Sequence, residues 1–436
     1  MATYQTGKRT SPTRRGGSSR QSSEVQGRTS GRSFSSRGRS SSSRGGNFSS
    51  RGGNSSRGRF PQRGRRRTSE RIDHSLFIYK PTEAVQVKKY TPENSFADFG
   101  FPGILVKNLH QKGLQFPTEI QDKIIPHGMH GDDVIGLAAT GSGKTMAFLL
   151  PLIKKVSENP DQKVLILAPT RELAQQINSE FMMASYGLKL FSTVCVGGMP
   201  IFRQINSLKR MNQFIIGTPG RIKDLADRGV LDYSTMHSVV LDEVDRMLDM
   251  GFVDDITKIL NSLPLERQSF FFSATMPERI KNLIHAHLRE PKVVDTGAGV
   301  STKNVTQDIV RFNDQTEKFE KLSGLLNGAN KEKSIIFVET KSGVDTLTGE
   351  LKRAGFKAGL IHGDRRQRER DQVLKDFKLG KIDILVATDV AARGIDVKNV
   401  YQVINYTIPQ THDDYIHRIG RTGRAGQLGK AFTFVS

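Results

Sequence analysis

From about residue 96 to the end of the chain, short apolar runs alternate with longer segments of helical periodicity. Six runs in the first half have the length and composition of β-strands: 134–137, 164–168, 191–196, 214–216, 238–241 and 269–272. A short polar stretch at 296–306 follows, and the pattern then restarts at 334–338, 358–361, 382–387, 400–405 and 431–435. Strands that alternate with helices are typical of parallel sheets covered on both faces. We therefore predict two α/β domains in tandem, 96–298 and 299–436, joined at a hinge.

Residues 1–70 have a different composition, dominated by Arg, Gly and Ser, with 17 Arg and Lys residues against Glu24 and Glu70. A segment with so few apolar residues is expected to be disordered, because it cannot bury enough surface to offset the entropy of folding. Residues 71–95 read as a linker. Arg-Gly repeats with sparse aromatic residues suit contact with phosphates and stacking on unpaired bases. A solubilising tail without a specific partner is the alternative, and the charge density favours nucleic acid.

Charge and cysteine content narrow the partners and the compartment. The 436-residue chain has a formal net charge of +22 and a pI near 10.0, which indicates a polyanionic partner. Its single cysteine, Cys195, excludes an intramolecular disulfide framework and fits a reducing compartment. No apolar run approaches the roughly 18 residues of a membrane span, and the N-terminus lacks a secretory apolar core. We expect a cytoplasmic monomer with no membrane partner.

A strand-like run at 134–137 enters a Gly/Ser turn, and a Lys-Thr pair then opens an apolar helix. This layout is typical of a phosphate-binding loop, because glycines let successive N–H groups face one anion and the helix N-terminus adds its dipole. Lys144 can reach the β- and γ-phosphates, and the Thr145 hydroxyl suits a bound Mg²⁺. A Gly-rich turn without a ligand is the alternative. The predicted loop comprises Ala139, Thr140, Gly141, Ser142, Gly143, Lys144 and Thr145.

Two carboxylates, Asp242 and Glu243, follow the apolar run at 238–241. In open α/β sheets ligands lie beyond the carboxyl ends of the strands. One acid there can hold the Mg²⁺ of a triphosphate, and its neighbour can polarise the attacking water. An acidic strand end is usually solvated surface, but its combination with an upstream phosphate loop favours the catalytic interpretation.

The segment Asp242-Glu243-Val244-Asp245 resembles the signature of the DEAD-box ATP-dependent RNA helicases, with Val244 in place of the usual alanine. Further stretches resemble the family's other motifs in the same order, over about residues 96–436. The features at 247–252 and 270–276 look most like those of bacterial members related to RhlE. The resembling stretches are 113–121, 169–174, 197–198, 218–221, 273–275, 335–338, 362–364, 387–396 and 417–424.

The resemblance implies two RecA-like domains with ATP and Mg²⁺ bound mainly by the first. Gln121 would read adenine with its amide, helped by Phe96, while Leu114 stands where the family has an aromatic ring. Thr145 and Asp242 would hold Mg²⁺. The second domain would add Gly394 and Asp396 to the nucleotide site, and Arg421 and Arg424 as arginine fingers. An exposed basic turn is the alternative for these two arginines.

The same resemblance places RNA across both domains through largely sequence-independent backbone contacts. Asp245, Ser273, Thr275 and His417 would couple the ATP state to strand separation, with Ser273 and Thr275 bonded to Asp245 and His417. It also implies that the second domain continues through a further helix beyond Ser436. The implied RNA-facing residues are Pro169, Thr170, Arg171, Gly198, Thr218, Pro219, Gly220, Arg221, Gly363 and Thr388.

These expectations describe an ATP-dependent helicase that remodels RNA duplexes locally. Three alternatives share parts of the same sequence signal. A DNA-directed helicase would use the same two-domain engine, and an RNA clamp would bind RNA with ATP without unwinding. A pure binding module would owe its affinity to residues 1–70, which the set of catalytic motifs disfavours.

Overall fold

The structure is a computed structural model that describes residues 77–79, 90–139, 141–297, 304–330, 332–392, 397, 400–423 and 428–436. The predicted tail at 1–70 lies outside these residues, as do Thr140, Gly394, Asp396 and Arg424. No helix in the described part of the chain is both long and apolar enough to span a bilayer.

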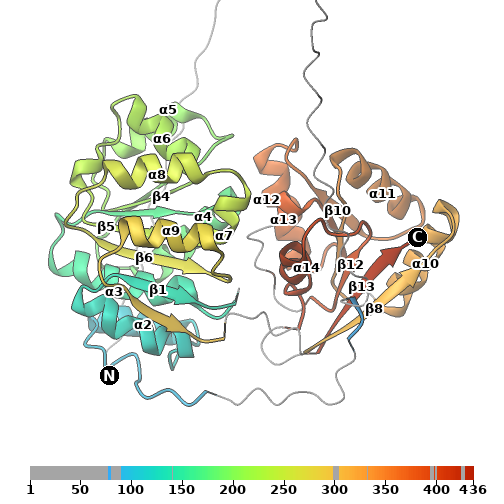
Figure 1. Ribbon diagram of the computed structural model, residues 1–436, viewed down its shortest axis with the longest axis horizontal. Helices are drawn as coiled ribbons and strands as arrows, with labels where there is room; N and C mark the ends of the chain where they lie inside the picture. The colour runs from blue at the N-terminus through green and yellow to red at the C-terminus, as the bar shows by residue number, and fades with distance from the viewer. Residues whose placement is uncertain are drawn as a thin grey trace, which may run out of the picture. The chain divides into compact units, whose positions relative to one another are not determined.

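The first domain is built on a seven-stranded sheet in which every neighbouring pair is parallel (Figure 1). The strand order is β3-β4-β2-β5-β6-β1-β7, so β3 and β7 form the two edges. The strands are β1 (Val134–Leu137), β2 (Val164–Leu167), β3 (Ser192–Cys195), β4 (Phe214–Gly217), β5 (Ser238–Leu241), β6 (Gln268–Ser273) and β7 (Lys292–Asp295).

Helices cover both faces of this sheet because side chains alternate along each strand. In β2, for example, Ile166 packs into a core with α1 to α4, whereas Leu165 packs into a second core with α6 to α9. The helices are α1 (Gly103–Gln111), α2 (Glu119–His130), α3 (Lys144–Glu158), α4 (Arg171–Ala184), α5 (Ile201–Leu208), α6 (Pro219–Asp227), α7 (Val244–Asp249), α8 (Val253–Ser262) and α9 (Glu278–His287).

The second domain repeats this architecture with six parallel strands in the order β10-β11-β9-β12-β13-β8. Its two cores again lie on opposite faces, one against α10 and α11 and the other against α12 and α13. The elements are β8 (Val305–Arg311), α10 (Gln315–Gly328), β9 (Ser334–Phe337), α11 (Lys341–Arg353), β10 (Ala358–Ile361), α12 (Gln367–Lys378), β11 (Ile384–Ala387), α13 (Asp389–Ala392), β12 (Gln402–Asn405), α14 (His412–Ile419) and β13 (Gly429–Val435). The prediction of two parallel-sheet domains in tandem is confirmed.

Two strands were missing from the prediction, and both are edge strands. In β7 only Val294 is buried. The other positions can therefore be polar, and the strand has no long apolar run. In β8 the polar residues Gln307 and Asp308 interrupt the pattern, and its first residues fall in the stretch assigned to the hinge. An edge strand with one covered side needs fewer apolar residues than a central strand.

The segment Phe77–Tyr79, which the sequence placed in a linker, belongs structurally to the second domain. Tyr79 pairs antiparallel with Gln307 of β8 through two main-chain hydrogen bonds of 3.0 and 2.7 Å, visible as a short blue strand beside β8 (Figure 1). Phe77 is fully buried in a small core, where its ring lies 4.7 Å from that of Tyr415. The interpretation of 71–95 as a linker is therefore wrong for these residues.

We expect Phe77→Ala to release this segment from β8. Truncating a packed phenylalanine costs about 3–5 kcal/mol, and the same short segment carries the Tyr79–Gln307 pair. Hydrogen exchange should show the amides of Tyr79 and Gln307 losing protection, while the neighbouring substitution Ile78→Ala, at a 54% exposed side chain, leaves them protected. Unchanged protection in Phe77→Ala would contradict the anchoring role.

Candidate nucleotide and nucleic-acid site

The predicted phosphate loop connects β1 to α3 at the carboxyl end of the sheet. Gly143 caps α3 at a φ of 98°, and a Cβ there would collide with the Gln121 side chain, so this position requires glycine. Lys144 is the first residue of α3 and is 7% exposed. Its Nζ donates to the Ala138 carbonyl at 3.0 Å, which holds the ammonium group against the loop. The Ser142 Oγ is buried without a hydrogen-bond partner among the described residues.

Gln121, the predicted adenine reader, is built into the loop's support. Its Oε1 accepts from the Thr118 N–H at 3.0 Å, which completes a capping box at the start of α2, and its Nε2 donates to the Gly143 carbonyl at 3.0 Å. The amide keeps one hydrogen and one lone pair beyond these two bonds. Adenine recognition by Gln121 stays a prediction. Phe96 is 1% exposed within the apolar core, and Leu114 packs against that core.

Asp242 follows β5, next to β2 in the sheet, and is 3% exposed. Its Oδ1 has no hydrogen-bond partner among the described residues. Burial raises the pKa of this carboxyl to about 7, although the positive charge of Lys144 opposes the shift. A buried carboxyl with one oxygen left without a partner, beside a lysine, is typical of a site that binds a cation.

Glu243 stands in the left-handed region at φ 56° and caps α7. A non-glycine residue in this conformation stores strain of about 1–3 kcal/mol and persists where its surroundings enforce it. Burial by itself would raise the pKa of Glu243, but the charges of Arg246 and Lys144 lower it overall. Arg246, which is 1% exposed, lies 3.5 Å from the Glu243 carboxylate. The two adjacent acids therefore differ in charge at neutral pH, with Glu243 ionised.

The raised pKa of Asp242 predicts that the nucleotide-free protein loses stability as pH rises. Between the unfolded pKa of 3.8 and the folded pKa of about 7, the folded state keeps a proton that the unfolded state has released. The free energy of unfolding should therefore fall by up to about 4 kcal/mol over this window and level off above it. Urea unfolding of the wild type and of Asp242→Asn at several pH values tests this. A wild-type decline no steeper than that of Asp242→Asn would contradict it.

The predicted RNA-facing residues of the first domain lie at the starts of α4 and α6 and in the β3–α5 loop. The Thr170 hydroxyl caps α4 by accepting from the Leu173 N–H at 3.2 Å. Gly198 adopts φ 71° directly against the Arg171 guanidinium, leaving no room for a side chain. Arg221 donates to the Met199 carbonyl at 3.2 Å. Arg171 and Arg221 thus both converge on this loop. Pro169, Thr218, Pro219 and Gly220 belong to the same helix starts.

The predicted coupling residue Asp245 is the acceptor for the loop after β6. Its Oδ2 accepts from the Ala274 N–H at 2.9 Å, the Thr275 N–H at 3.1 Å and the Thr275 hydroxyl at 3.3 Å. The Ser273 hydroxyl donates to the Thr275 carbonyl at 2.7 Å. This bond uses the hydroxyl hydrogen within its own loop, and a bond from Ser273 to Asp245 or His417 stays a prediction.

In the second domain Arg421 is 5% exposed just after α14, His417 lies within α14, and Thr388 and Gly363 follow β11 and β10. Arg418, for which no role was predicted, is a central anchor of this domain. Its guanidinium forms two hydrogen bonds of 2.6 and 2.7 Å with Asp389 and donates to the Thr407 carbonyl at 2.7 Å. The sequence signal for this contact was weak. It consisted of an arginine within the amphipathic helix α14 and an acid, Asp389, at the start of α13.

The residues of the first domain fit a magnesium nucleotide. The glycine-bounded loop and Lys144 match a polyphosphate, and the unpartnered oxygen of Asp242 matches a cation or its water shell. Among the described residues no cluster of three or more His, Cys, Asp or Glu side chains could hold a metal by itself. Mg²⁺ would thus take its other ligands from phosphate oxygens and water, which is its usual preference.

Comparison with known proteins also indicates a nucleotide-dependent helicase. The DEAD/DEAH box helicase family matches residues 118–283, and the helicase conserved C-terminal domain matches residues 317–426. The ATP-dependent RNA helicase CshA of Listeria monocytogenes is 46% identical over 341 residues, covering 78% of this chain. The chain belongs to the DEAD/DEAH box helicase family. It spans 66% of the length of the Listeria relative.

A solved member of this fold is also similar. Dbp5 from S. cerevisiae, in a structure bound to RNA and ADP BeF3, superposes with a TM-score of 0.70 at 32% identity. The match covers 78% of this chain and 89% of that chain. The assignment of both domains as RecA-like is confirmed at the level of fold. The narrower resemblance to RhlE-related members stays a prediction.

Proposed function

We propose that this protein is an ATP-dependent RNA helicase that separates short duplexes locally. The observation that carries the proposal is the buried Asp242 carboxyl, whose Oδ1 has no partner among the described residues, at the same carboxyl end of the sheet as Lys144 and its phosphate loop. The family membership supports it, because the Listeria relative is described as an ATP-dependent RNA helicase. A cytoplasmic location and a monomeric state are part of the proposal and rest on the sequence.

In the proposed reaction each acid has its own task. Lys144 and the loop N–H groups would bind the β- and γ-phosphates, and Asp242 with Thr145 would hold Mg²⁺, partly through water. The bound ion would neutralise charge that develops on the phosphates. Glu243, ionised at neutral pH, orients the attacking water and takes its proton. Arg421 and Arg424 would complete the site from the second domain, together with Gly394 and Asp396.

The proposed RNA path uses the convergence of Arg171 and Arg221 on the β3–α5 loop. Charged groups and close backbone approach fix a strand without reading its sequence. Gly363 and Thr388 would continue the path on the second domain. ATP and RNA would stabilise the same closed state, so each should tighten the binding of the other by an equal factor. The similarity to Dbp5, solved with RNA, supports this part.

The deciding experiment is steady-state ATPase without nucleic acid, with single-stranded RNA and with DNA of matched sequence. Stimulation by RNA alone supports the proposal, and duplex unwinding then becomes the next assay. Equal stimulation by DNA favours a DNA-directed helicase. Hydrolysis stimulated by RNA without any unwinding favours an RNA clamp. Lys144→Ala gives the background rate.

The protonation of Asp242 predicts that magnesium nucleotide binds more weakly at acid pH. The carboxyl has to lose its proton before it can serve the cation, because only the carboxylate is a ligand. With a folded pKa of about 7, affinity should fall by about tenfold per pH unit below that value. Titration with a fluorescent ATP analogue and Mg²⁺ at several pH values checks this. The same titration without Mg²⁺ is the control, and an equal decline there would contradict the role of Asp242.

A further inference from the structure

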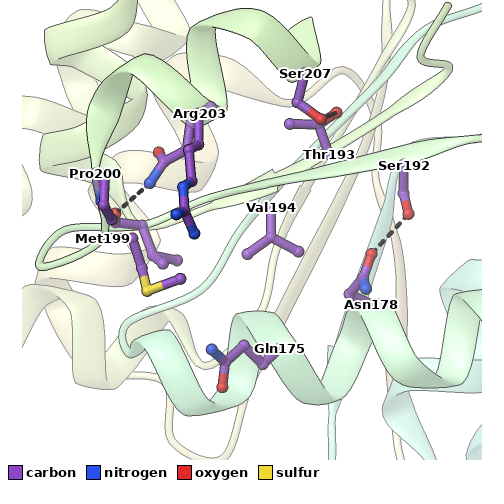
Figure 2. A pocket seen from close by; sticks show the side chains of 11 residues that line it. Gln175, Asn178, Ser192, Thr193, Val194, Met199, Pro200, Arg203 and Ser207 are labelled. Carbon is purple, nitrogen blue, oxygen red and sulfur yellow. Dashed lines mark hydrogen bonds between the residues drawn. The ribbon is translucent and has the colours of Figure 1, made fainter. Parts of the chain in front are cut away.

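A pocket on the first domain lies beside the proposed RNA path but has no role in it. It has a volume of about 360 Å³ and lies between α4 and α5 against the edge strand β3 (Figure 2). This volume is at the small end of the range for ligand pockets, about 300–1,000 Å³. Its rim includes Met199 and Pro200, which directly follow Gly198 in the β3–α5 loop. Met199, whose carbonyl accepts from Arg221, thus also lines the pocket.

The pocket contains a buried polar atom without a partner. Gln204, on α5, is 6% exposed and lines the pocket. Its Nε2 donates to the Val196 carbonyl at 3.0 Å, which fixes the orientation of the amide. The opposite atom, Oε1, has no hydrogen-bond partner among the described residues. Because protein atoms cover this acceptor, Gln204 forms a fixed polar wall of the pocket and not an open hydrogen-bonding group.

Apart from Arg203, the other polar side chains of the pocket are neutral and include both hydrogen-bond donors and acceptors. Gln175 and Asn178 stand three residues apart on α4 and thus share its pocket-facing side. Ser192 donates to the Asn178 Oδ1 at 2.6 Å, which leaves the Nδ2 hydrogens of Asn178 for another acceptor. Arg203 of α5 extends into the space between the two helices (Figure 2) and adds one positive charge. No Asp or Glu is among the described residues that line the pocket.

This set of groups discriminates between ligand classes. A phosphate or carboxylate would call for donors alone, and a metal cation for acceptors alone. Carboxamides that offer both donors and acceptors match the edge of a nucleobase, and asparagine and glutamine are established partners of such edges. Val194, Val196 and Met199 supply apolar surface on which a planar ring can rest.

We propose that this pocket receives one unstacked base of the bound RNA and gives the protein a base preference. The inference rests on the proposed RNA path, because a base can enter only if its backbone runs over the Gly197–Gly198 loop. Single-stranded RNA is commonly recognised through bases turned out of the stack and hydrogen-bonded at their edges. The path contacts fix the strand, and Gln175 and Asn178 contact the base.

The test compares the affinities of four short RNA homopolymers in the presence of Mg²⁺ and a non-hydrolysable ATP analogue. For the wild-type chain we expect the tightest and weakest homopolymers to differ by about tenfold. The double variant Gln175→Ala/Asn178→Ala changes no charge and should reduce this ratio to near one, while the weakest homopolymer binds as before. The matched control Gln176→Ala lies on the same helix, pairs with Glu180 and should keep the wild-type ratio.

A second measurement locates the base directly. RNA that carries a photoreactive thiouridine should crosslink to the peptide containing Met199 in the wild type and much less in the double variant. Equal affinities for all homopolymers in the wild type, or a ratio unchanged in the double variant, would overturn the proposal. If either of these two results is found, a polypeptide strand added to β3 becomes the alternative occupant of the pocket.

The failure of this inference is distinguishable from that of the proposed function. Arg171→Ala should weaken all four homopolymers to a similar extent if RNA follows the proposed path. If Arg171→Ala loses affinity and the ratio between the tightest and weakest homopolymers is unchanged, the RNA path is supported. The base site is then judged by the double variant alone. A wild-type chain that binds none of the homopolymers would overturn the proposed function together with the base site.

Discussion

Lys144→Ala is expected to lower the rate of ATP hydrolysis by about 10²–10³-fold. The Lys144 ammonium is held at the phosphate loop by its 3.0 Å bond to the Ala138 carbonyl, and it is almost fully buried. A fixed positive charge in such a place stabilises the transferred phosphoryl group more than it would in water. Steady-state release of phosphate at saturating RNA measures the effect. Nucleotide affinity, measured separately, should also fall.

The matched control for this prediction is Lys154→Ala on the same helix. Lys154 forms an ion pair of 3.2 Å with Glu158 and lies away from the loop, so its loss should leave hydrolysis unchanged. Thermal unfolding of both variants shows whether the fold is retained. Hydrolysis by a folded Lys144→Ala protein at the wild-type rate would remove the phosphate loop from the proposed mechanism.

The fold could be predicted from the sequence wherever burial on both sides forces an apolar run. The inner strands β1 and β5 were predicted with their observed bounds, because both faces of each are covered. The edge strands β7 and β8 escaped, since a strand with an open side can carry polar residues. The docking of Phe77 on Tyr415 depends on two residues far apart in the chain, which no local pattern connects.

The candidate site likewise has parts that could be predicted from contiguous stretches of sequence and parts that depend on residues far apart in the chain. The phosphate loop and the acids after β5 were predictable, because each is a contiguous stretch at a strand end. The hydrogen bonds that hold these segments in place could not be predicted. Gln121 bonds to Gly143, and the Arg418 guanidinium joins α14 to Asp389, and in both cases the partners lie many residues apart. The left-handed backbone of Glu243 was equally hidden, since a glutamate gives no sign of this conformation.

Asp245→Ala is expected to separate hydrolysis from unwinding. The Asp245 carboxylate accepts two N–H groups and one hydroxyl from the loop at 274–275 and therefore fixes that loop to α7. Hydrogen bonds to a charged acceptor contribute about 1.5–3 kcal/mol each. Without them the loop loses its fixed position, and unwinding should fall by about a hundredfold, whereas Asp242, Glu243 and Lys144 remain in place. We expect ATP hydrolysis to fall by less than about tenfold.

Smaller changes to the same contact provide a graded test of this coupling. Thr275→Ala removes only the 3.3 Å hydroxyl bond and leaves both N–H donors on Asp245, so the ratio of unwinding to hydrolysis should fall only slightly. Adding Ser273→Ala also removes the 2.7 Å bond within the loop, and the double variant should lie between Thr275→Ala and Asp245→Ala. The ratio is measured with one RNA duplex under identical conditions. If hydrolysis and unwinding fall equally across the series, the loop serves the ATP site itself, because a coupling element would affect the two rates differently.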